Sequence, residues 1–216
     1  MDQRKKQKQT NLAMEIVSEK DANKALDFLS QGKVLAFPTE TSYGLGCDAR
    51  YQEAVYKIFR IKERSSDMPL LVVVSSVEEA KKYLQWNELL DKLSKRYWPG
   101  ALTVVAKASE AAKDQLARGV VSDRGTLALR VTEFNFLRHL TEKVGSPLVA
   151  TSANLSGEDN IYKSEEVKRV FKKRIEKPDA LIDGGTLLER SSSTLVSVID
   201  NELKILRQGE VDIDTI

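Results

Sequence analysis

Short apolar runs alternate along this chain with segments in which apolar residues recur at the period of a helix. The clearest runs are Leu70–Val74, Leu102–Ala106, Leu127–Val131 and Leu148–Ala150. Runs of about five residues have the length of buried strands and are far below the span of a membrane helix. Apolar residues between Ala54 and Phe59 recur at helical spacing, which predicts an amphipathic helix over residues 51–61. Strands interleaved with helices indicate an α/β fold.

The same patterns predict the remaining elements. Further helices are expected from Ser18, as N-cap, to about Leu29, over Val77–Leu84, Glu88–Tyr97 and Phe136–Val144, and from Ser164 onward. Further strands are expected over Val34–Phe37, Ala180–Ile182, Thr194–Ile199 and Leu203–Leu206. Only Asp200 and Asn201 separate the last two strands, so this pair is predicted to be antiparallel. No repeat or linker-like segment divides the chain, so we expect one domain.

Charge and cysteine content exclude several classes of protein. The 34 basic and 32 acidic side chains nearly cancel, so binding of RNA or nucleotide requires local clusters of charge. The single cysteine, Cys47, and the single histidine, His139, exclude an internal disulfide and a cysteine- or histidine-rich metal site. Residues 1–14 are basic and precede no long apolar stretch, so we interpret them as a disordered tail and expect no membrane contact. The expected location is the cytoplasm.

A segment dense in hydroxyl groups and glycines follows the first expected apolar strand, over Pro38–Gly46. Its side chains offer donors and acceptors to a small polar ligand, and Gly44 and Gly46 permit backbone angles closed to other residues. The same residue types also make ordinary turns. These residues alone therefore leave two interpretations of Thr39–Asp48, a ligand-binding loop and a plain turn.

Three cations, Arg60, Lys62 and Arg64, lie at and just beyond the end of the expected helix 51–61. Cations at this position complement the negative end of the helix dipole, which is the simpler interpretation. A planar guanidinium and a lysine ammonium are also suited to phosphate binding. The pattern alone leaves both interpretations open.

Two more polar segments lie beside apolar strands. Thr151–Gly157 continues from Leu148–Ala150, and ligands gather at the carboxyl ends of strands in open α/β sheets. Ser191–Thr194 leads into a strand, and Arg207–Gly209 stands at the end of the next one. Each segment alone is equally compatible with a solvated loop or turn.

In combination, these motifs are specific. The runs are FPTETSYGLGCDA, IFRIKERSSDMPL, YWPGALTVV, LALRV, PLVATSANLSG, STLVSV and ILRQG. In order and spacing they resemble the YrdC-like domain of YrdC/TsaC-type threonylcarbamoyl-AMP synthases, over residues 15–210. The resemblance implies a twisted mixed β-sheet flanked by helices, with a concave basic cavity for ATP and threonine. With residues 211–216 as a short tail and no second domain, the short single-domain form is the closer match.

The resemblance also implies roles for individual residues. The Lys-x-Arg and Ser-x-Asn signature of the family falls on Lys62, Arg64, Ser152 and Asn154, and Lys62 and Arg64 are the expected catalytic residues. The expected contacts to L-threonine are Thr41, Tyr43, Arg130, Ala150 and Ser193. The expected contacts to ATP are Lys62, Arg64, Met68, Thr126, Ser152, Asn154, Asn160 and Arg207. No side chain is singled out as a general base: Cys47 is interpreted as a packing residue and His139 as a surface residue.

The implied reaction joins L-threonine, bicarbonate or CO2, and ATP into L-threonylcarbamoyladenylate with release of pyrophosphate. Mg²⁺ is expected to arrive with the ATP, since the chain has neither a Walker-type loop nor a carboxylate cluster. The product would pass to a TsaD-type transferase complex for tRNA threonylcarbamoyladenosine biosynthesis.

Two other functions are considered as alternatives to this predicted enzyme. The first is a YciO-like module that binds RNA without this activity; the intact Ser-x-Asn signature favours the enzyme, to which weak tRNA binding is a possible addition. The second is a carbamoyl-transfer module of the hydrogenase-maturation type, which is the weaker alternative because its accompanying acylphosphatase and zinc-finger segments are missing. The sequence leaves open the oligomeric state and the choice between bicarbonate and CO2.

Overall fold

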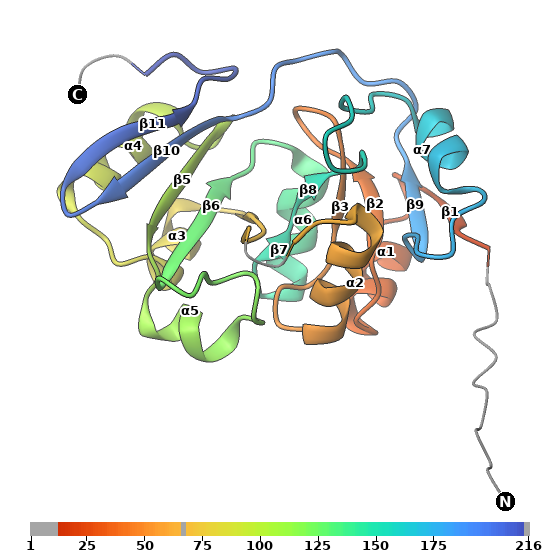
Figure 1. The fold of residues 1–216 in the computed structure, drawn as a ribbon, viewed down its shortest axis with the longest axis horizontal. Coiled ribbons are helices and arrows are strands. Elements are labelled where there is room, and N and C mark those ends of the chain that lie inside the picture. The colour runs from red at the N-terminus through yellow and green to blue at the C-terminus, as the bar shows by residue number, and fades with distance from the viewer. Residues whose placement is uncertain (1–12, 66–67, 214–216) are drawn as a thin grey trace, which may run out of the picture.

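The computed structural model describes residues 13–65 and 68–213, which form two mixed β-sheets flanked by helices (Figure 1). The first sheet has the strand order β1 (Glu15–Ser18), β9 (Ala180–Asp183), β2 (Leu35–Pro38), β3 (Tyr43–Gly46) and β8 (Thr151–Ser152). The second has the order β11 (Glu202–Arg207), β10 (Thr194–Ile199), β5 (Leu102–Lys107), β6 (Thr126–Val131), β4 (Val72–Val74) and β7 (Leu148–Val149). The helices are α1 (Ala22–Ser30), α2 (Gln52–Lys62), α3 (Val77–Tyr83), α4 (Glu88–Tyr97), α5 (Glu110–Gln115), α6 (Asn135–Val144) and α7 (Ser164–Phe171). The predicted mixed α/β class is confirmed, with the strands divided between two sheets.

The expected tails fall largely outside the described ranges. This holds for residues 1–12 and 214–216. Within the expected C-terminal tail, the N–H of Val211 donates to Oγ1 of Thr194 at 3.0 Å, so this part of the chain lies against β10. No helix in the described ranges has the length and apolar character that crossing a bilayer requires.

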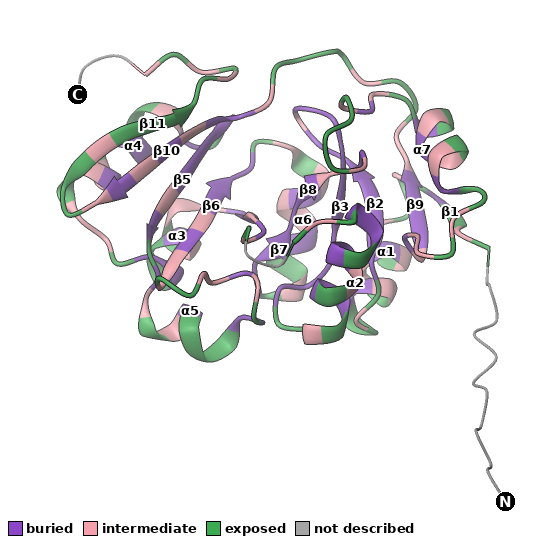
Figure 2. Ribbon diagram, in the orientation of Figure 1, coloured by how far each residue is buried: buried purple, intermediate pink, exposed green. Residues whose placement is uncertain are grey.

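Strand β2 is apolar throughout because it is buried on both faces. Leu35 and Phe37 pack into a cluster with helices α1 and α6, whereas Ala36 packs into the larger cluster on the opposite side. Side chains alternate between the two faces of a strand, so burial on both faces requires an apolar residue at every position. Figure 2 shows the same burial along β3 and β9.

Residues 148–152 join the two sheets. Strand β7 pairs with β4 in the second sheet, and β8, one residue further on, pairs with β3 in the first. The backbone alternates between them, since the N–H of Val149 donates to the carbonyl of Cys47 at 2.8 Å and that of Ala150 to the carbonyl of Leu71 at 3.0 Å. The polar segment that begins at Thr151 therefore lies at the junction of the sheets.

The sequence patterns located the C-terminal hairpin and the last helix correctly. Strands β10 and β11 pair antiparallel, and the intervening Asp200 and Asn201 have φ angles of 53° and 62°. Asn and Asp tolerate these left-handed angles, which tight hairpins require. Helix α7 begins at Ser164, with Glu165 and Glu166 in its first turn, as predicted.

The N-terminal boundary was predicted wrongly. Ser18 is not an N-cap but the last residue of β1; the cap of α1 is Asp21, whose carboxylate accepts the N–H of Lys24 at 3.2 Å. The charged stretch after β5, for which no element was predicted, contains α5, capped by Ser109. Neither β1 nor α5 is long enough to produce a clear periodic pattern.

The segment Thr39–Asp48 was predicted to be a loop, yet it contains β3. Neither Gly44 nor Gly46 uses the positive φ angles that glycine permits. They are required by close packing instead. A Cβ on Gly46 would lie 2.0 Å from the carbonyl oxygen of Val149 and 2.5 Å from the ring of Phe37. Strand β3 therefore approaches its neighbours at a distance that a side chain would prevent.

Replacing Gly46 by alanine is expected to destabilise the fold, because the added methyl group meets a backbone oxygen that cannot move away easily. Overpacking of this kind costs about 2 kcal/mol or more. Urea denaturation measures the loss. Gly145→Ala is the matched control, since a Cβ there meets nothing within 4 Å and the cost is confined to a φ of 66°, about 1 kcal/mol. Equal losses at the two positions would contradict the packing argument.

Candidate functional site

A cavity of about 600 Å³ lies where the two sheets meet. Its charged lining consists of four arginines and one carboxylate, namely Arg64, Arg124, Arg130, Arg207 and Asp123. Its other polar side chains are Thr39, Thr41, Ser42, Ser122, Thr126, Thr151, Ser152, Asn160, Ser192 and Ser193. A volume of this size suits a nucleotide-sized ligand, and the excess of guanidinium groups favours an anionic one.

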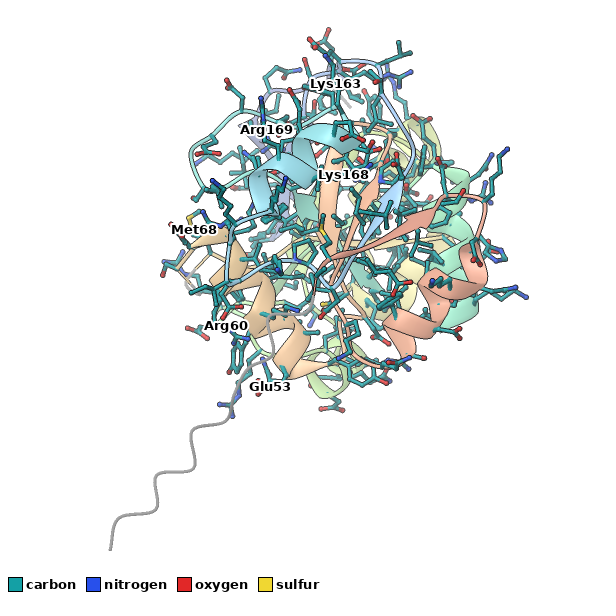
Figure 3. The ribbon with its side chains drawn as sticks, turned by 90° about the vertical axis from the view of Figure 1, so that its right-hand side faces the viewer. Glu53, Arg60, Met68, Lys163, Lys168 and Arg169 are labelled. Carbon is teal, nitrogen blue, oxygen red and sulfur yellow. The ribbon has the colours of Figure 1, made fainter. Side chains whose placement is uncertain are left out.

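The three cations at the end of α2 have different surroundings. Arg60 pairs with Glu176 at 3.1 Å on the outer surface, where Figure 3 shows it beside α2. Lys62 is buried, and Arg64 lines the cavity. An interaction with the helix dipole would be the same for all three cations, so it does not explain their different surroundings.

Arg64 reaches the cavity because α2 ends in a left-handed turn at Glu63, which has a φ of 50°. Its guanidinium has weak protein contacts. Nη2 is 3.5 Å from the carbonyl oxygen of Pro69, and the buried Nε has no hydrogen-bond partner among the described residues. Burial lowers the pKa of Arg64. A guanidinium with unused donors on a cavity wall is arranged to receive an oxyanion.

Lys62 lies behind the cavity wall and does not line it. Only 3% of the residue is exposed, and its Nζ donates to the carbonyl oxygens of Ser152 at 2.5 Å and Asn154 at 2.8 Å. Burial, reinforced by the positive charge of Arg64, lowers the pKa of Lys62 to about 8. The ammonium thus links the end of α2 to the polar loop after β8.

The two members of the Ser-x-Asn signature are oriented differently. Ser152 lines the cavity, while Asn154 does not. The side-chain amide of Asn154 donates to the carbonyl oxygen of Glu158 and so closes the loop on itself. Asn154 is therefore placed to shape the loop that presents Ser152.

The hydroxyl-rich segment before β3 is ordered by Thr39. Its Oγ1 accepts the N–H groups of Thr41 at 3.1 Å and Ser42 at 3.2 Å, and both of these residues line the cavity. Tyr43 points elsewhere: its hydroxyl donates to Gly185 at 2.9 Å and accepts from Gly184 at 3.1 Å. Burial raises the pKa of Tyr43.

The second sheet and the segment that joins the sheets contribute further residues to the cavity. These residues come from motifs that lie far apart in the sequence. Arg130 lies on β6, with a side chain only 4% exposed, and Ala150 lies between β7 and β8. Ser193 precedes β10, and its Oγ is 2.8 Å from Oγ1 of Thr103. All but Thr103 line the cavity.

Strand β11 supplies Arg207, whose Nη2 donates to the carbonyl oxygen of Ser193 at 2.8 Å. Burial, together with the positive charge of Arg130, lowers the pKa of Arg207. Thr126 begins β6, with its hydroxyl 2.7 Å from that of Ser122, and Asn160 donates to Ser192 at 3.2 Å. Thr126, Asn160 and Arg207 all line the cavity.

Some predicted site residues lie elsewhere, and some lining residues were missed. Met68 is 52% exposed at the outer surface (Figure 3) and is not among the residues that line the cavity. The cavity is also lined by Ser122, Asp123 and Arg124, which belong to a loop with no recognisable motif beyond its charge. The turn at Gly125, with a φ of 70°, brings this loop back into β6.

Neither Cys47 nor His139 is among the residues that line the cavity. Cys47 is fully buried in the core, where burial raises the pKa of its thiol. His139 is a half-buried residue of α6. Within residues 13–65 and 68–213, no group of three His, Cys, Asp or Glu side chains could hold a metal ion.

Fold and site together define an α/β protein with an arginine-lined cavity at the junction of two mixed sheets. The model of the Sua5, YciO and YrdC family, which carries the description "telomere recombination", matches residues 27–209. The chain belongs to this family.

Curated relatives extend the comparison. The chain is 34% identical over 193 residues to a threonylcarbamoyl-AMP synthase of Pyrococcus abyssi and 35% identical over 188 residues to one of Bacillus subtilis. These alignments cover 89% and 87% of this chain but 55% and 53% of the relatives, so the chain spans about half their length. The solved structure of P. abyssi Sua5 complexed with L-threonine matches with a TM-score of 0.81 at 32% identity, over 92% of this chain and 58% of that one.

Proposed function

We propose that this protein synthesises L-threonylcarbamoyladenylate from L-threonine, bicarbonate or CO2, and ATP, with release of pyrophosphate. The observation that carries the proposal is the convergence of Arg64, Arg130 and Arg207 with hydroxyl groups on one cavity. A triphosphate and an amino-acid carboxylate are both anions, and separate guanidinium groups can bind them. Relatives named threonylcarbamoyl-AMP synthase, and one solved with L-threonine, support this choice among reactions of anionic substrates.

In the proposed complex, Arg130 binds the carboxylate of threonine, and Thr41, Ala150 and Ser193 surround the amino acid. Arg64, Thr126, Ser152, Asn160 and Arg207 contact the nucleotide. Met68, Tyr43 and Asn154 are not among the residues that line the cavity, and the hydroxyl of Tyr43 and the amide of Asn154 donate to Gly185 and Glu158 instead. Lys62 acts from behind the wall through Ser152 and Asn154.

The proposed chemistry has two steps. The amine of threonine first forms a carbamate, by losing water with bicarbonate or a proton with CO2. A carbamate oxygen then bonds to the α-phosphorus while the bond from that phosphorus to pyrophosphate breaks. Positioning and charge neutralisation supply most of the acceleration in reactions of this type. Arg64 is the half-buried guanidinium with unused donors that suits the developing charge on pyrophosphate.

Mg²⁺ is proposed to enter with the ATP. Among the described residues that line the cavity, Asp123 is the one carboxylate, so the donor set suits a cation carried by phosphates better than a resident one. The proposal also includes a cytoplasmic location, delivery of the product to a TsaD-type transferase complex for tRNA modification, and weak RNA binding as an accessory property.

The test is incubation of the purified protein with ATP, labelled bicarbonate and L-threonine. We expect pyrophosphate release that depends on threonine, and label in an adenylate product. An active relative assayed in parallel serves as the control. Pyrophosphate release that is absent, or independent of threonine, would overturn the proposal.

Binding of an ATP analogue at about pH 8.5 is expected to take up roughly half a proton. Lys62 has a pKa of about 8, so it is largely neutral at that pH, and a nearby triphosphate favours its charged form. The phosphates themselves are already fully ionised. Calorimetry in two buffers of different ionisation enthalpy measures the uptake, which Lys62→Met should abolish. Equal uptake by the variant would contradict the assignment to Lys62.

A further inference from the structure

Arg130 faces a buried carboxylate that sequence motifs did not single out. Glu40 lies in the turn between β2 and β3, and its Oε1 is 3.4 Å from Nε of Arg130. Both side chains are only 4% exposed. The hydroxyl of Thr132 lies 3.2 Å and 3.1 Å from the two carboxylate oxygens of Glu40 and holds that side chain in place.

The contact leaves most of the guanidinium available. Nε of Arg130 is buried and makes no hydrogen bond among the described residues, and Glu40 is its ion-pair partner there. Because Glu40 lies on the Nε side, the two Nη groups are left for the cavity that Arg130 lines. A guanidinium binds a carboxylate best through two parallel hydrogen bonds, which require a fixed plane.

Glu40 also offsets charge. Arg64, Arg130 and Arg207 line one cavity, and an unpaired buried cation is expensive to retain. The field of Arg130 is strong enough at Arg207 to contribute to lowering the pKa of Arg207. A buried carboxylate next to Arg130 lets this guanidinium stay in place while the site is empty.

We propose that Glu40 is a positioning residue for L-threonine, which holds the guanidinium of Arg130 so that its Nη groups meet the substrate carboxylate. This inference rests on the proposed function, in which Arg130 binds threonine. Two effects of Glu40 oppose each other: its negative charge disfavours a second carboxylate, whereas its contact fixes the plane that recognises one. Orientation dominates because a bidentate interaction tolerates little rotation of the guanidinium.

The test is the isosteric variant Glu40→Gln, which removes the charge and keeps the shape. Calorimetry should show threonine binding weakened about tenfold, with the affinity for a non-hydrolysable ATP analogue unchanged. In turnover assays, KM for threonine should rise by more than kcat falls. Glu133→Gln is the matched control, since Glu133 is 47% exposed and pairs with Arg190 at 3.7 Å on the surface; its threonine affinity should equal that of the wild type.

If Glu40→Gln fails to fold, Thr132→Val tests the same positioning role of Glu40. Losing the hydroxyl that holds Glu40 should weaken threonine binding about threefold, again without affecting the ATP analogue. A wild-type protein that does not bind threonine would overturn the proposed function and this inference together. Wild-type binding with equal or tighter binding by Glu40→Gln, or unchanged binding by Thr132→Val, would overturn the inference alone.

Discussion

Replacing Arg64 by alanine is expected to lower kcat/KM for the proposed formation of threonylcarbamoyladenylate roughly 10³-fold, the effect of losing a cation at developing phosphate charge. Stability should change little. The guanidinium has one long contact, 3.5 Å to Pro69, and a buried Nε without a partner among the described residues. Removing it therefore breaks no strong contact with the residues that the structure describes. Steady-state pyrophosphate release, with thermal unfolding measured alongside, checks both expectations.

Two further variants separate charge from geometry at this position. Arg64→Lys keeps the charge without the planar fork, so its activity should fall by about tenfold, between wild type and alanine. Arg60→Ala removes a cation from the same helix end that faces outward to Glu176, and its activity should stay within about twofold of wild type. Similar losses for Arg60→Ala and Arg64→Ala would show that the cations act only through overall charge.

Replacing Lys62 by methionine is expected to reduce turnover about 100-fold, as the loss of a group that positions others does in a preorganised site. The ammonium holds the carbonyl oxygens of Ser152 and Asn154 at 2.5 and 2.8 Å, and methionine has a similar length but no donor. The loop that presents Ser152 should then lose its fixed position. Single-turnover measurements, which separate chemistry from ATP binding, detect this loss.

Lys62→Met also tests how the free energy of unfolding depends on pH. Folding lowers the pKa of Lys62 from 10.5 to about 8, so below pH 8 the folded state holds a proton at a cost of about 3 kcal/mol. Wild-type stability should therefore gain from Lys62 as the pH rises from 8 to 10.5, and Lys62→Met should lack this gain. Urea denaturation at about pH 7 and pH 9.5 measures it. If the stability of wild type and Lys62→Met changed equally between the two pH values, the lowered pKa of Lys62 would be contradicted.

Several buried strands could be predicted because their burial requires runs of apolar or alternating apolar residues. The runs at β5, β6 and β10 appear as apolar residues and coincide closely with the observed strands. Strand β3 could not be found in this way. Tyr43–Gly46 has two glycines, which weaken strand propensity, and it is a strand because β2 and β8 supply its hydrogen-bond partners. That information, like the division into two sheets, comes from distant parts of the chain.

The candidate site was predicted by motif, and the structure brings most of these positions together. The predicted residues that line the cavity are Thr41, Arg64, Thr126, Arg130, Ala150, Ser152, Asn160, Ser193 and Arg207. Those that do not are Tyr43, Lys62, Met68 and Asn154. A motif fixes a position in the chain but not the direction of a side chain, which depends on packing. Glu40 lies within the FPTETSYGLGCDA run but was assigned no role, and Arg124 lies outside the motifs, since an isolated charge in a loop has no periodicity.

A crystal structure with L-threonine and a non-hydrolysable ATP analogue bound together would show whether both substrates occupy the arginine-lined cavity. We expect both ligands between the sheets, with the threonine carboxylate on Arg130 and the triphosphate facing Arg64. This expectation would be contradicted by either ligand binding on another face, or by threonine contacting neither Arg130 nor the residues around it.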